Sequence, residues 1–231
     1  MSAKLTVSRL NASSIELQIY GDIGDPFDGI TAKQVGEVLS DAGDVDLIRV
    51  RLNSLGGSAN EGVAIYNRLK QHPARVEVDV DGVAASAASV VALAGNTVRM
   101  GKAALIMIHE AAAGLLGFYG ADELMAVIEG LESVNNVIVD LYADATGTPA
   151  DEIRQMMAAT TWFDGEEAVA AGFATELVEE LPIAASFDWG RVPEPPADKR
   201  QRLQQAMVAR PPRETTADKG LAVVRGLKCQ S

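Results

Sequence analysis

Two serines stand in a run of small residues near the middle of the chain, and one of them could serve as a nucleophile. The run GVAASAAS spans residues 82–89 and contains Ser86 and Ser89. Close packing of a helix would explain the small residues, and so would a nucleophile that a substrate must approach. A serine at a strand-to-helix junction is exposed and lies at the positive end of the helix dipole. Ser86 is therefore the candidate nucleophile, whereas we expect Ser89 to pack or to bond back to a carbonyl.

A serine nucleophile requires a general base, and the chain contains two histidines. His72 lies in KQHPARV, and we interpret it as a residue of a surface loop. His109 ends the apolar run ALIMIHE, where a purely structural role is the alternative. If Ser86 is catalytic, His109 is its suitable partner, because strand–helix–strand units can bring both residues to one edge of a sheet.

A glycine-rich turn, NSLGGSANEG at residues 53–62, also follows a predicted strand. It lacks the spacing of dinucleotide- and NTP-binding loops, and no lysine follows its glycines, so we expect no nucleotide site. Open backbone N–H groups at a helix start could instead stabilise an oxyanion.

Hydrophobic periodicity predicts strands and helices in alternation over the first 189 residues. The predicted strands cover residues 14–24, 45–54, 74–82 and 97–110, the last as one strand or two. The predicted helices cover residues 30–43, 62–72, 84–95, 120–147 and 149–159. Residues 161–181 are predicted as a turn, a helix and a last strand. This alternation predicts an α/β domain with a largely parallel sheet, whose site lies at the turns that follow the strands.

Charge is unevenly distributed along the 231 residues, whose net charge is −12. Residues 190–231 carry nine lysines and arginines against four acids, a balance of +5, so the preceding 189 residues carry −17. The acidic body argues against nucleic acid as a partner. We therefore expect one domain over residues 1–189 and a flexible, Pro-rich basic tail over 190–231, with a short helix at 198–210.

The single cysteine, Cys229, cannot form a disulfide framework or a cysteine metal site within one chain. Its isolation fits a reducing compartment. No apolar run approaches the length that spans a bilayer, and the N-terminal residues carry no long apolar segment. We expect neither a secretory signal nor a membrane partner.

Four segments together resemble the Clp-type serine peptidases, in order and in spacing. They are LNSLGGSANEGVAIYNRL, VDGVAASAASVVALAG, MIHEAAAG and WFDGEEAVAAGFATELV. The resemblance covers about residues 15–180 and is greatest to the phage-encoded branch, which includes head-maturation proteases. It implies a ClpP/crotonase-like spiral of βαβ units. It also implies that the long helix from about Gly120 to Thr146 is the family's handle, which joins two rings face to face.

The resemblance also implies the roles of individual residues. Ser86 matches the nucleophile and His109 the general base. Gly57 and Ala87 match the two amide donors of the oxyanion hole. The stretches that follow Gly57 and His109 resemble the edges that hold a substrate peptide as an added β-strand.

Two positions depart from the family pattern. Leu55 stands where the family usually has proline, which we expect to matter little because the glycines remain. Thr160 stands where the family has the acidic member of its triad. Three interpretations follow: Asp164 substitutes for that acid, a Ser–His dyad with Thr160 suffices, or the protein is a weakened or inactive relative.

The expected function is that of a serine-type endopeptidase that cleaves peptide or protein substrates as a homo-oligomer of one or stacked rings. The resemblance favours a phage prohead or capsid maturation protease, acting on capsid or scaffold protein in the bacterial cytoplasm or the prohead. A host-like role with an unfoldase ATPase is less favoured. No metal or organic cofactor is required. The alternatives are a catalytically silent ClpP-like scaffold and a crotonase-like acyl-CoA enzyme.

Overall fold

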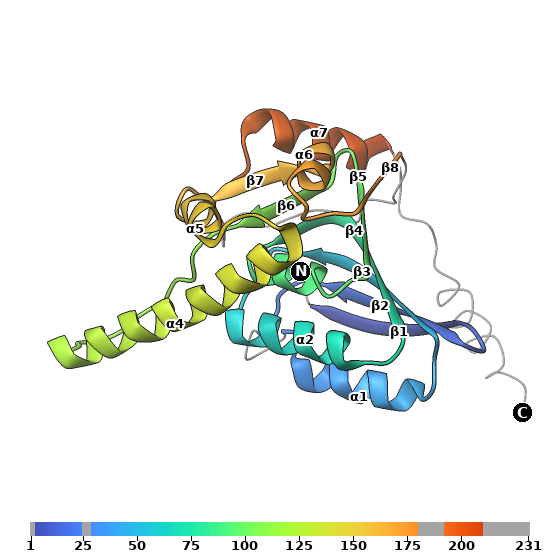
Figure 1. The fold of residues 1–231 in the computed structure, drawn as a ribbon, viewed down its shortest axis with the longest axis horizontal. Helices are drawn as coiled ribbons and strands as arrows, with labels where there is room; N and C mark the ends of the chain where they lie inside the picture. Colours follow the sequence, from blue (N-terminus) through green and yellow to red (C-terminus); the bar gives the residue numbers. More distant parts are fainter. Residues whose placement is uncertain (1–2, 25–28, 180–191, 210–231) are drawn as a thin grey trace, which may run out of the picture.

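The computed structural model describes residues 3–24, 29–179 and 192–209, and it shows a mixed α/β fold (Figure 1). The described strands are β1 (Lys4–Asn11), β2 (Ser14–Tyr20), β3 (Leu47–Ser54), β4 (Arg75–Ala85), β5 (Thr97–Gly101), β6 (Leu105–Ile108), β7 (Thr161–Asp164) and β8 (Glu176–Val178). The described helices are α1 (Ala32–Ala42), α2 (Ala59–Gln71), α3 (Ala87–Ala92), α4 (Ala121–Thr146), α5 (Ala150–Ala158), α6 (Gly165–Ala170) and α7 (Ala197–Ala209).

The sheet is built by successive crossovers of the type expected for a βαβ chain. Its main path runs β1-β2-β3-β4-β5-β8, and every pair from β2 to β8 along that path is parallel. Strand β4 has 11 residues and pairs with β5 along its first part and with β6 at its end. Strand β6 in turn pairs with β7 in antiparallel fashion. This step from β5 to β6 makes the sheet a spiral, as the family resemblance implied.

One face of the sheet forms the main core. Alternate residues of β2, β3 and β4 point toward α1, α2 and α3, since successive strand residues face opposite sides. The buried apolar residues of these three strands include Ile15, Leu17, Ile19, Ile48, Val50, Leu52, Val76, Val78 and Val80. Helices α1 and α2 contribute Val35, Leu39, Ile65 and Leu69 to the same core.

The opposite face carries a ladder of charged side chains. Its centre is Asp81, whose side chain is fully buried on β4 and accepts hydrogen bonds from Arg51 Nε at 2.8 and 2.9 Å. The hydroxyl of Tyr20 also donates to Asp81. Because β2, β3 and β4 each contribute one member, the network ties three strands together close to the carboxyl end of β4.

Helix α7 covers the far end of this second face. Its Leu203 is fully buried. It packs in a small apolar cluster with Val83, Ala85, Leu105, Met107 and Trp162. Lys199 Nζ donates to the carbonyl of Trp162 at 2.9 Å, and Arg202 pairs with Asp164 at 2.9 Å. A part of the predicted tail thus packs against β4, β6 and β7, while residues 210–231 lie outside the described residues; the predicted domain boundary near residue 190 stays a prediction.

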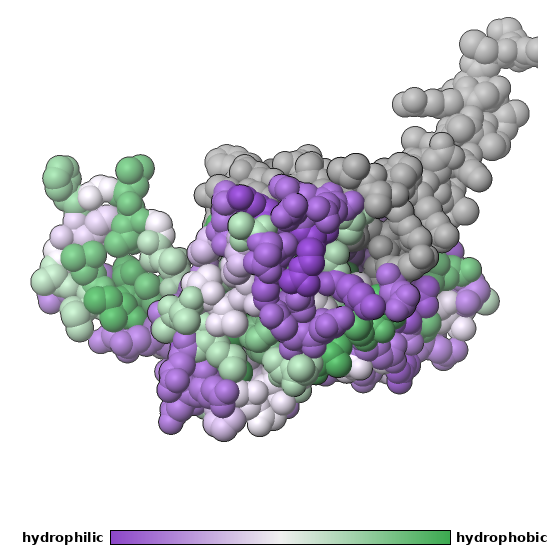
Figure 2. Space-filling view, turned by 90° about the horizontal axis from the view of Figure 1, so that it is seen from above, coloured by the Kyte–Doolittle hydropathy of each residue, from purple (hydrophilic) through white to green (hydrophobic). Residues whose placement is uncertain are grey.

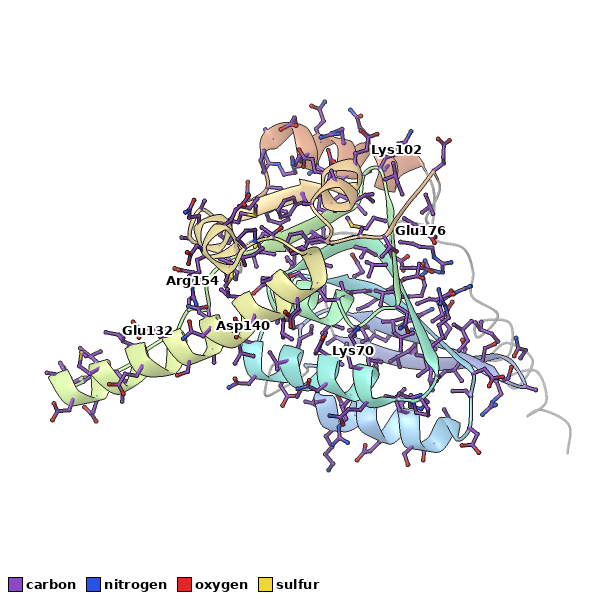
Figure 3. The ribbon with its side chains drawn as sticks, in the orientation of Figure 1. Lys70, Lys102, Glu132, Asp140, Arg154 and Glu176 are labelled. Carbon is purple, nitrogen blue, oxygen red and sulfur yellow. The ribbon has the colours of Figure 1, made fainter. Side chains whose placement is uncertain are left out.

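Helix α4 projects from the body as an arm (Figure 1). Its 26 residues correspond to about 39 Å at 1.5 Å per residue. Glu132 lies along the projecting part and Asp140 nearer the body (Figure 3). The predicted end of this helix is confirmed, because Gly147 caps it in the left-handed conformation. In the described parts of the chain, no helix combines the length and apolarity needed to cross a membrane.

Three elements differ from the sequence prediction. Strand β1 was not expected; it pairs with β2 at the sheet edge and is largely exposed, so it shows no strong hydrophobic alternation. Strand β7 occupies part of the predicted turn. Strand β4 continues to Ala85, so the predicted helix at 84–95 is the shorter α3. Small residues such as those at 82–85 fit a buried strand between β3 and β6 as well as a helix.

Candidate functional site

Ser86 lies in the sharp turn between β4 and α3. Its backbone has φ 55° and ψ −126°, a conformation that is costly for a residue with a Cβ. The backbone N–H of Ser86 donates to Met107 O at 2.9 Å, which ties the turn to β6. A strained strand-to-helix turn presents a serine hydroxyl outward, which is the geometry that a nucleophile requires.

His109 follows β6 directly and meets Ser86 across the paired ends of β4 and β6. Its Nε2 lies 2.7 Å from Ser86 Oγ. Burial lowers the pKa of the His109 imidazole, because removal from water disfavours its charged form. At neutral pH the ring is therefore unprotonated, and Nε2 can accept the hydroxyl proton of Ser86.

The glycine-rich turn after β3 packs directly on the turn that carries Ser86. A Cβ on Gly56 would lie 2.6 Å from Ala85 O and 2.9 Å from Ala87 N, so a larger residue is sterically excluded. Gly57 has φ 140° and sits against Ile23, where a Cβ would lie 2.1 Å from the Ile23 carbonyl oxygen. Only glycine fits both positions, and this close approach explains the Gly-Gly pair in the sequence.

Two backbone N–H groups beside Ser86 are available to a ligand. Ile23 N donates to Gly56 O and Ser58 N donates to Ile23 O, so the N–H of Gly57 points away from Ile23. Ala87 is the first residue of α3 and therefore has no acceptor within its own helix. Within residues 3–24, 29–179 and 192–209, no hydrogen bond engages the N–H of Gly57 or of Ala87.

Thr160 and Asp164 occupy different places relative to His109. Thr160 precedes β7, and the pairing of Ile108 with Thr161 places its backbone beside His109. The Thr160 backbone has φ 53°, which a β-branched residue rarely adopts. Among the described residues, no hydrogen bond joins the Thr160 hydroxyl to His109. The hydrogen-bond partner of the His109 ring is Ser86.

Asp164 stands at the other end of the same pair of strands, opposite Leu105. At about 3.3 Å per residue, the register places it about 13 Å from the Thr160 position. Its carboxylate caps α6 by accepting Glu167 N–H at 3.0 Å and pairs with Arg202. The contacts of Asp164 thus lie away from His109, and the described hydrogen bonds join the His109 ring to Ser86 alone.

A cavity of about 400 Å³ opens beside Ser86 and His109. Its walls come from the glycine-rich turn, the segment after His109, helix α4 and the segment before α7. The lining side chains are mainly small or apolar, and they include Leu55, Ala111, Ala112, Leu131, Val134 and Val192. Asp22 is the one acidic residue among the described residues of the lining.

Several residues that support this site were not identified from the sequence. Asn53 Oδ1 accepts Val83 N–H at 3.1 Å and so holds β4 near Ser86. Asn135 of α4 accepts Ala111 N–H at 2.8 Å. The expectation for Ser89 is confirmed, because its hydroxyl donates to Ser86 O at 2.6 Å. Among the residues not identified, only Asn53 lies in a segment that the sequence analysis singled out, as the first residue of the glycine-rich turn at 53–62.

Comparisons with known proteins identify the family to which this chain belongs. The family model described as Clp protease matches residues 8–181. The ATP-dependent Clp protease proteolytic subunit 2 of Thermobifida fusca is 30% identical over 161 residues, which cover 67% of this chain and 77% of the relative. A proteolytic subunit 3 of Streptomyces avermitilis is 30% identical over 169 residues, covering 71% and 74% of the two chains.

A solved structure, that of a point mutant of ClpP1 from Listeria monocytogenes, superposes with a TM-score of 0.62 at 25% identity and covers 71% of this chain and 91% of that one. The spiral α/β fold and the protease-family match define a ClpP-like protease fold. The chain belongs to the Clp protease family, as the resemblance of its motifs implied.

Proposed function

We propose that this protein is a serine-type endopeptidase in which Ser86 is the nucleophile and His109 the general base. The observation that carries the proposal is the 2.7 Å contact between Ser86 Oγ and His109 Nε2, next to two unengaged backbone N–H groups. Nucleophile, base and oxyanion donors within one cavity are the parts that acyl transfer requires.

The reaction follows from these positions. His109 Nε2 takes the hydroxyl proton of Ser86 as Oγ attacks the peptide carbonyl, and the carbonyl oxygen becomes an oxyanion held by the N–H groups of Gly57 and Ala87. His109 then gives the proton to the leaving amine, and the C–N bond breaks. A water molecule, deprotonated by His109, hydrolyses the acyl-enzyme and restores the Ser86 hydroxyl.

Thr160 occupies the third catalytic place in this proposal, but without a charge. Its hydroxyl makes no hydrogen bond to the His109 ring in the described structure, and a neutral hydroxyl cannot stabilise the imidazolium that forms during attack. Replacing a triad acid by a neutral group can cost about 10⁴ in turnover. The absence of a carboxylate partner among the described residues also supports a second candidate, an assembled protein of weak or absent activity.

The segment after His109 offers an edge for a substrate strand. Among the described residues, the backbone groups of residues 112–115 make no hydrogen bonds. An extended peptide could pair with such an edge and present its carbonyl to Ser86. The apolar lining from Leu131 and Val134 favours a hydrophobic side chain next to the cleaved bond.

Self-assembly through α4 accompanies the proposed activity. Eight of the eleven exposed large hydrophobic residues in the described chain lie on α4 or just before it, among them Leu116, Phe118, Met125 and Ile128. Figure 2 shows hydrophobic residues gathered on the projecting arm. A contiguous apolar surface of this kind is a protein contact site. We propose that second copies of the chain cover it, so that the site faces an enclosed chamber.

We propose capsid or scaffold protein in a phage prohead, assembled in the bacterial cytoplasm, as the substrate class, because the motifs of the chain resemble those of the phage-encoded branch. The relatives' names describe ATP-dependent proteolytic subunits, so an unfoldase ATPase is the alternative source of substrate. Cleavage of prohead proteins in the absence of ATP would support the prohead role, whereas a requirement for ATP would support the role with an unfoldase.

A fluorophosphonate probe tests the proposal. We expect covalent labelling of the wild-type chain, none in Ser86→Ala, and parallel loss of peptide cleavage. Labelling without measurable cleavage would support the weakly active candidate. Thioester hydrolysis of acyl-CoA by a chain that the probe fails to label would instead indicate a crotonase-like enzyme and overturn the proposal.

A further inference from the structure

A buried chain of hydrogen bonds runs from helix α4 to the backbone of the Ser86 turn. Ser89 and Tyr142 are each 1% exposed. Ser89 Oγ lies 2.6 Å from Ser86 O and 2.7 Å from the Tyr142 hydroxyl. Fifty-three sequence positions separate Ser89 from Tyr142, so the contact exists only through the fold.

The direction of both hydrogen bonds is fixed by chemistry. A carbonyl oxygen can only accept, so the single hydroxyl proton of Ser89 is donated to Ser86 O. The Tyr142 hydroxyl must then donate to Ser89 Oγ. Burial raises the pKa of the Tyr142 hydroxyl far above any physiological pH, so this donor keeps its proton.

The acceptor, Ser86 O, shares a peptide plane with Ala87 N–H. In a trans peptide the C=O and the following N–H point in opposite directions. Ser86 O accepts from Ser89 N at 2.9 Å as well as from Ser89 Oγ, so the carbonyl is held toward α3. Ala87 N–H is consequently held toward the Gly56–Gly57 turn, on the side of the cavity.

We propose that Ser89 and Tyr142 are positioning residues that fix and strengthen the Ala87 N–H as an oxyanion donor. Two hydrogen bonds to Ser86 O oppose rotation of the peptide plane in a turn whose φ of 55° is already strained. Hydrogen bonding to a carbonyl also polarises its amide, which makes the N–H a better donor. The inference rests on the proposed serine peptidase function and adds the residues that prepare its oxyanion hole.

The test compares Ser89→Ala, Tyr142→Phe and the double variant, because neither change introduces a larger group. Ser133→Ala is the matched control, since the Ser133 hydroxyl also donates to a helix carbonyl, Glu129 O at 2.8 Å, but does so at an exposed place. The readouts are the rate of fluorophosphonate labelling, kcat and KM for a peptide that the wild type cleaves, and the inhibition constant of a peptide boronate. Thermal unfolding reports whether each variant is folded.

We expect Ser89→Ala to lower labelling and kcat about tenfold or more, since an oxyanion donor is worth about 10²–10³ in kcat. KM should change less than about twofold, and boronate affinity should fall in parallel with kcat, because only the tetrahedral adduct uses the donor. Tyr142→Phe should give a smaller loss in the same direction. The double variant should match Ser89→Ala, because Tyr142 acts through Ser89.

Rates for both single variants within about twofold of Ser133→Ala would overturn the inference, as would a loss confined to KM. If Ser89→Ala is unfolded, Tyr142→Phe keeps the side-chain volume and decides the question alone. Failure of the wild type itself to label would overturn the proposed function rather than this inference.

Discussion

At the scale of single residues, the candidate site combines backbone strain with an uncharged third position. Ser86 and Thr160 are the two non-glycine residues with positive φ in the described part of the chain, and both adjoin His109. Strained residues gather where a site demands a fixed geometry. The strain at Ser86 presents the hydroxyl, whereas the strain at Thr160 has no matching hydrogen bond to His109.

Thr160→Asp should raise activity. Aspartate tolerates the left-handed conformation better than threonine, and its carboxylate would face the imidazolium that forms on His109. We expect kcat for a fluorogenic peptide to increase about tenfold or more. Thr160→Asn is the control, since it has the shape of aspartate without the charge. An equal gain in both variants would show that relief of strain, and not charge, limits the wild type.

The pH dependence of kcat/KM should report the His109 ring in the free enzyme. Burial lowers its pKa from the ordinary value of 6.5, and only the unprotonated ring can act as a base. Activity should therefore rise with pH through a midpoint below 6.5. In Thr160→Asp the added carboxylate favours the protonated ring, so that midpoint should shift upward. A wild-type midpoint above 6.5 would contradict the buried, unpaired state of the ring.

At the scale of elements, the second face of the sheet holds the end of β4 in place. Asp81 lies five residues before Ser86, and its buried carboxylate is satisfied by Arg51 from β3 and Tyr20 from β2. Removal of one member leaves a buried charge or a buried acceptor without its partner, which is far more costly than loss of an exposed ion pair.

Arg51→Ala should lower the free energy of unfolding by about 3–5 kcal/mol, because Asp81 would remain buried without its cation. Arg49→Ala offers a matched control two residues earlier on the same strand face. The Arg49 side chain is 35% exposed, and its contacts to Glu77 and Asp79 are 3.7 and 3.9 Å long. It should cost about 1 kcal/mol or less. Chemical denaturation measures both values. Similar losses in the two variants would contradict the claim that the buried pair of Arg51 with Asp81 contributes more to stability than the more exposed pairs of Arg49.

The sequence allowed prediction of the elements whose chemistry is local. Gly56, Gly57 and the small residues around Ser86 are dictated by close backbone approach, so they form a recognisable pattern. Pairings between distant segments leave no such pattern. The contact of Ser89 with Tyr142 depends on how α4 packs over α3, and periodicity does not encode that placement. Strand β1 escaped prediction because one edge strand needs little hydrophobic alternation.

At the scale of the whole molecule, the projecting arm of α4 would link the proposed self-assembly to the cavity. Most of the exposed apolar residues lie in the first part of α4 or just before it, and the middle of α4 contributes Leu131 and Val134 to the cavity wall. Covering the arm with a second copy would therefore also steady one side of the cavity. The apolar arm is costly to leave in water, which favours association.

The double variant Leu116→Ser, Phe118→Ser should weaken assembly without unfolding the chain. Both side chains are almost fully exposed, at 95% and 107%, so the single chain loses little packing when they become polar. Sedimentation velocity should show a smaller particle with an unchanged melting temperature. Val7→Ser is the control, since Val7 is also exposed but lies on β1. An unchanged particle size would exclude the apolar residues just before α4 as the contact.

Helix α7 packs against β4 and β6, although it lies outside residues 8–181, which match the family model. We therefore expect substitutions in α7 to affect activity. Leu203 packs against β4 and β6, the strands that directly precede Ser86 and His109, and Val192 lines the cavity. A saturation scan scored by peptide cleavage should therefore show a second group of intolerant positions at Lys199, whose side chain is 11% exposed, and at the buried Leu203, outside the sequence motifs of the family.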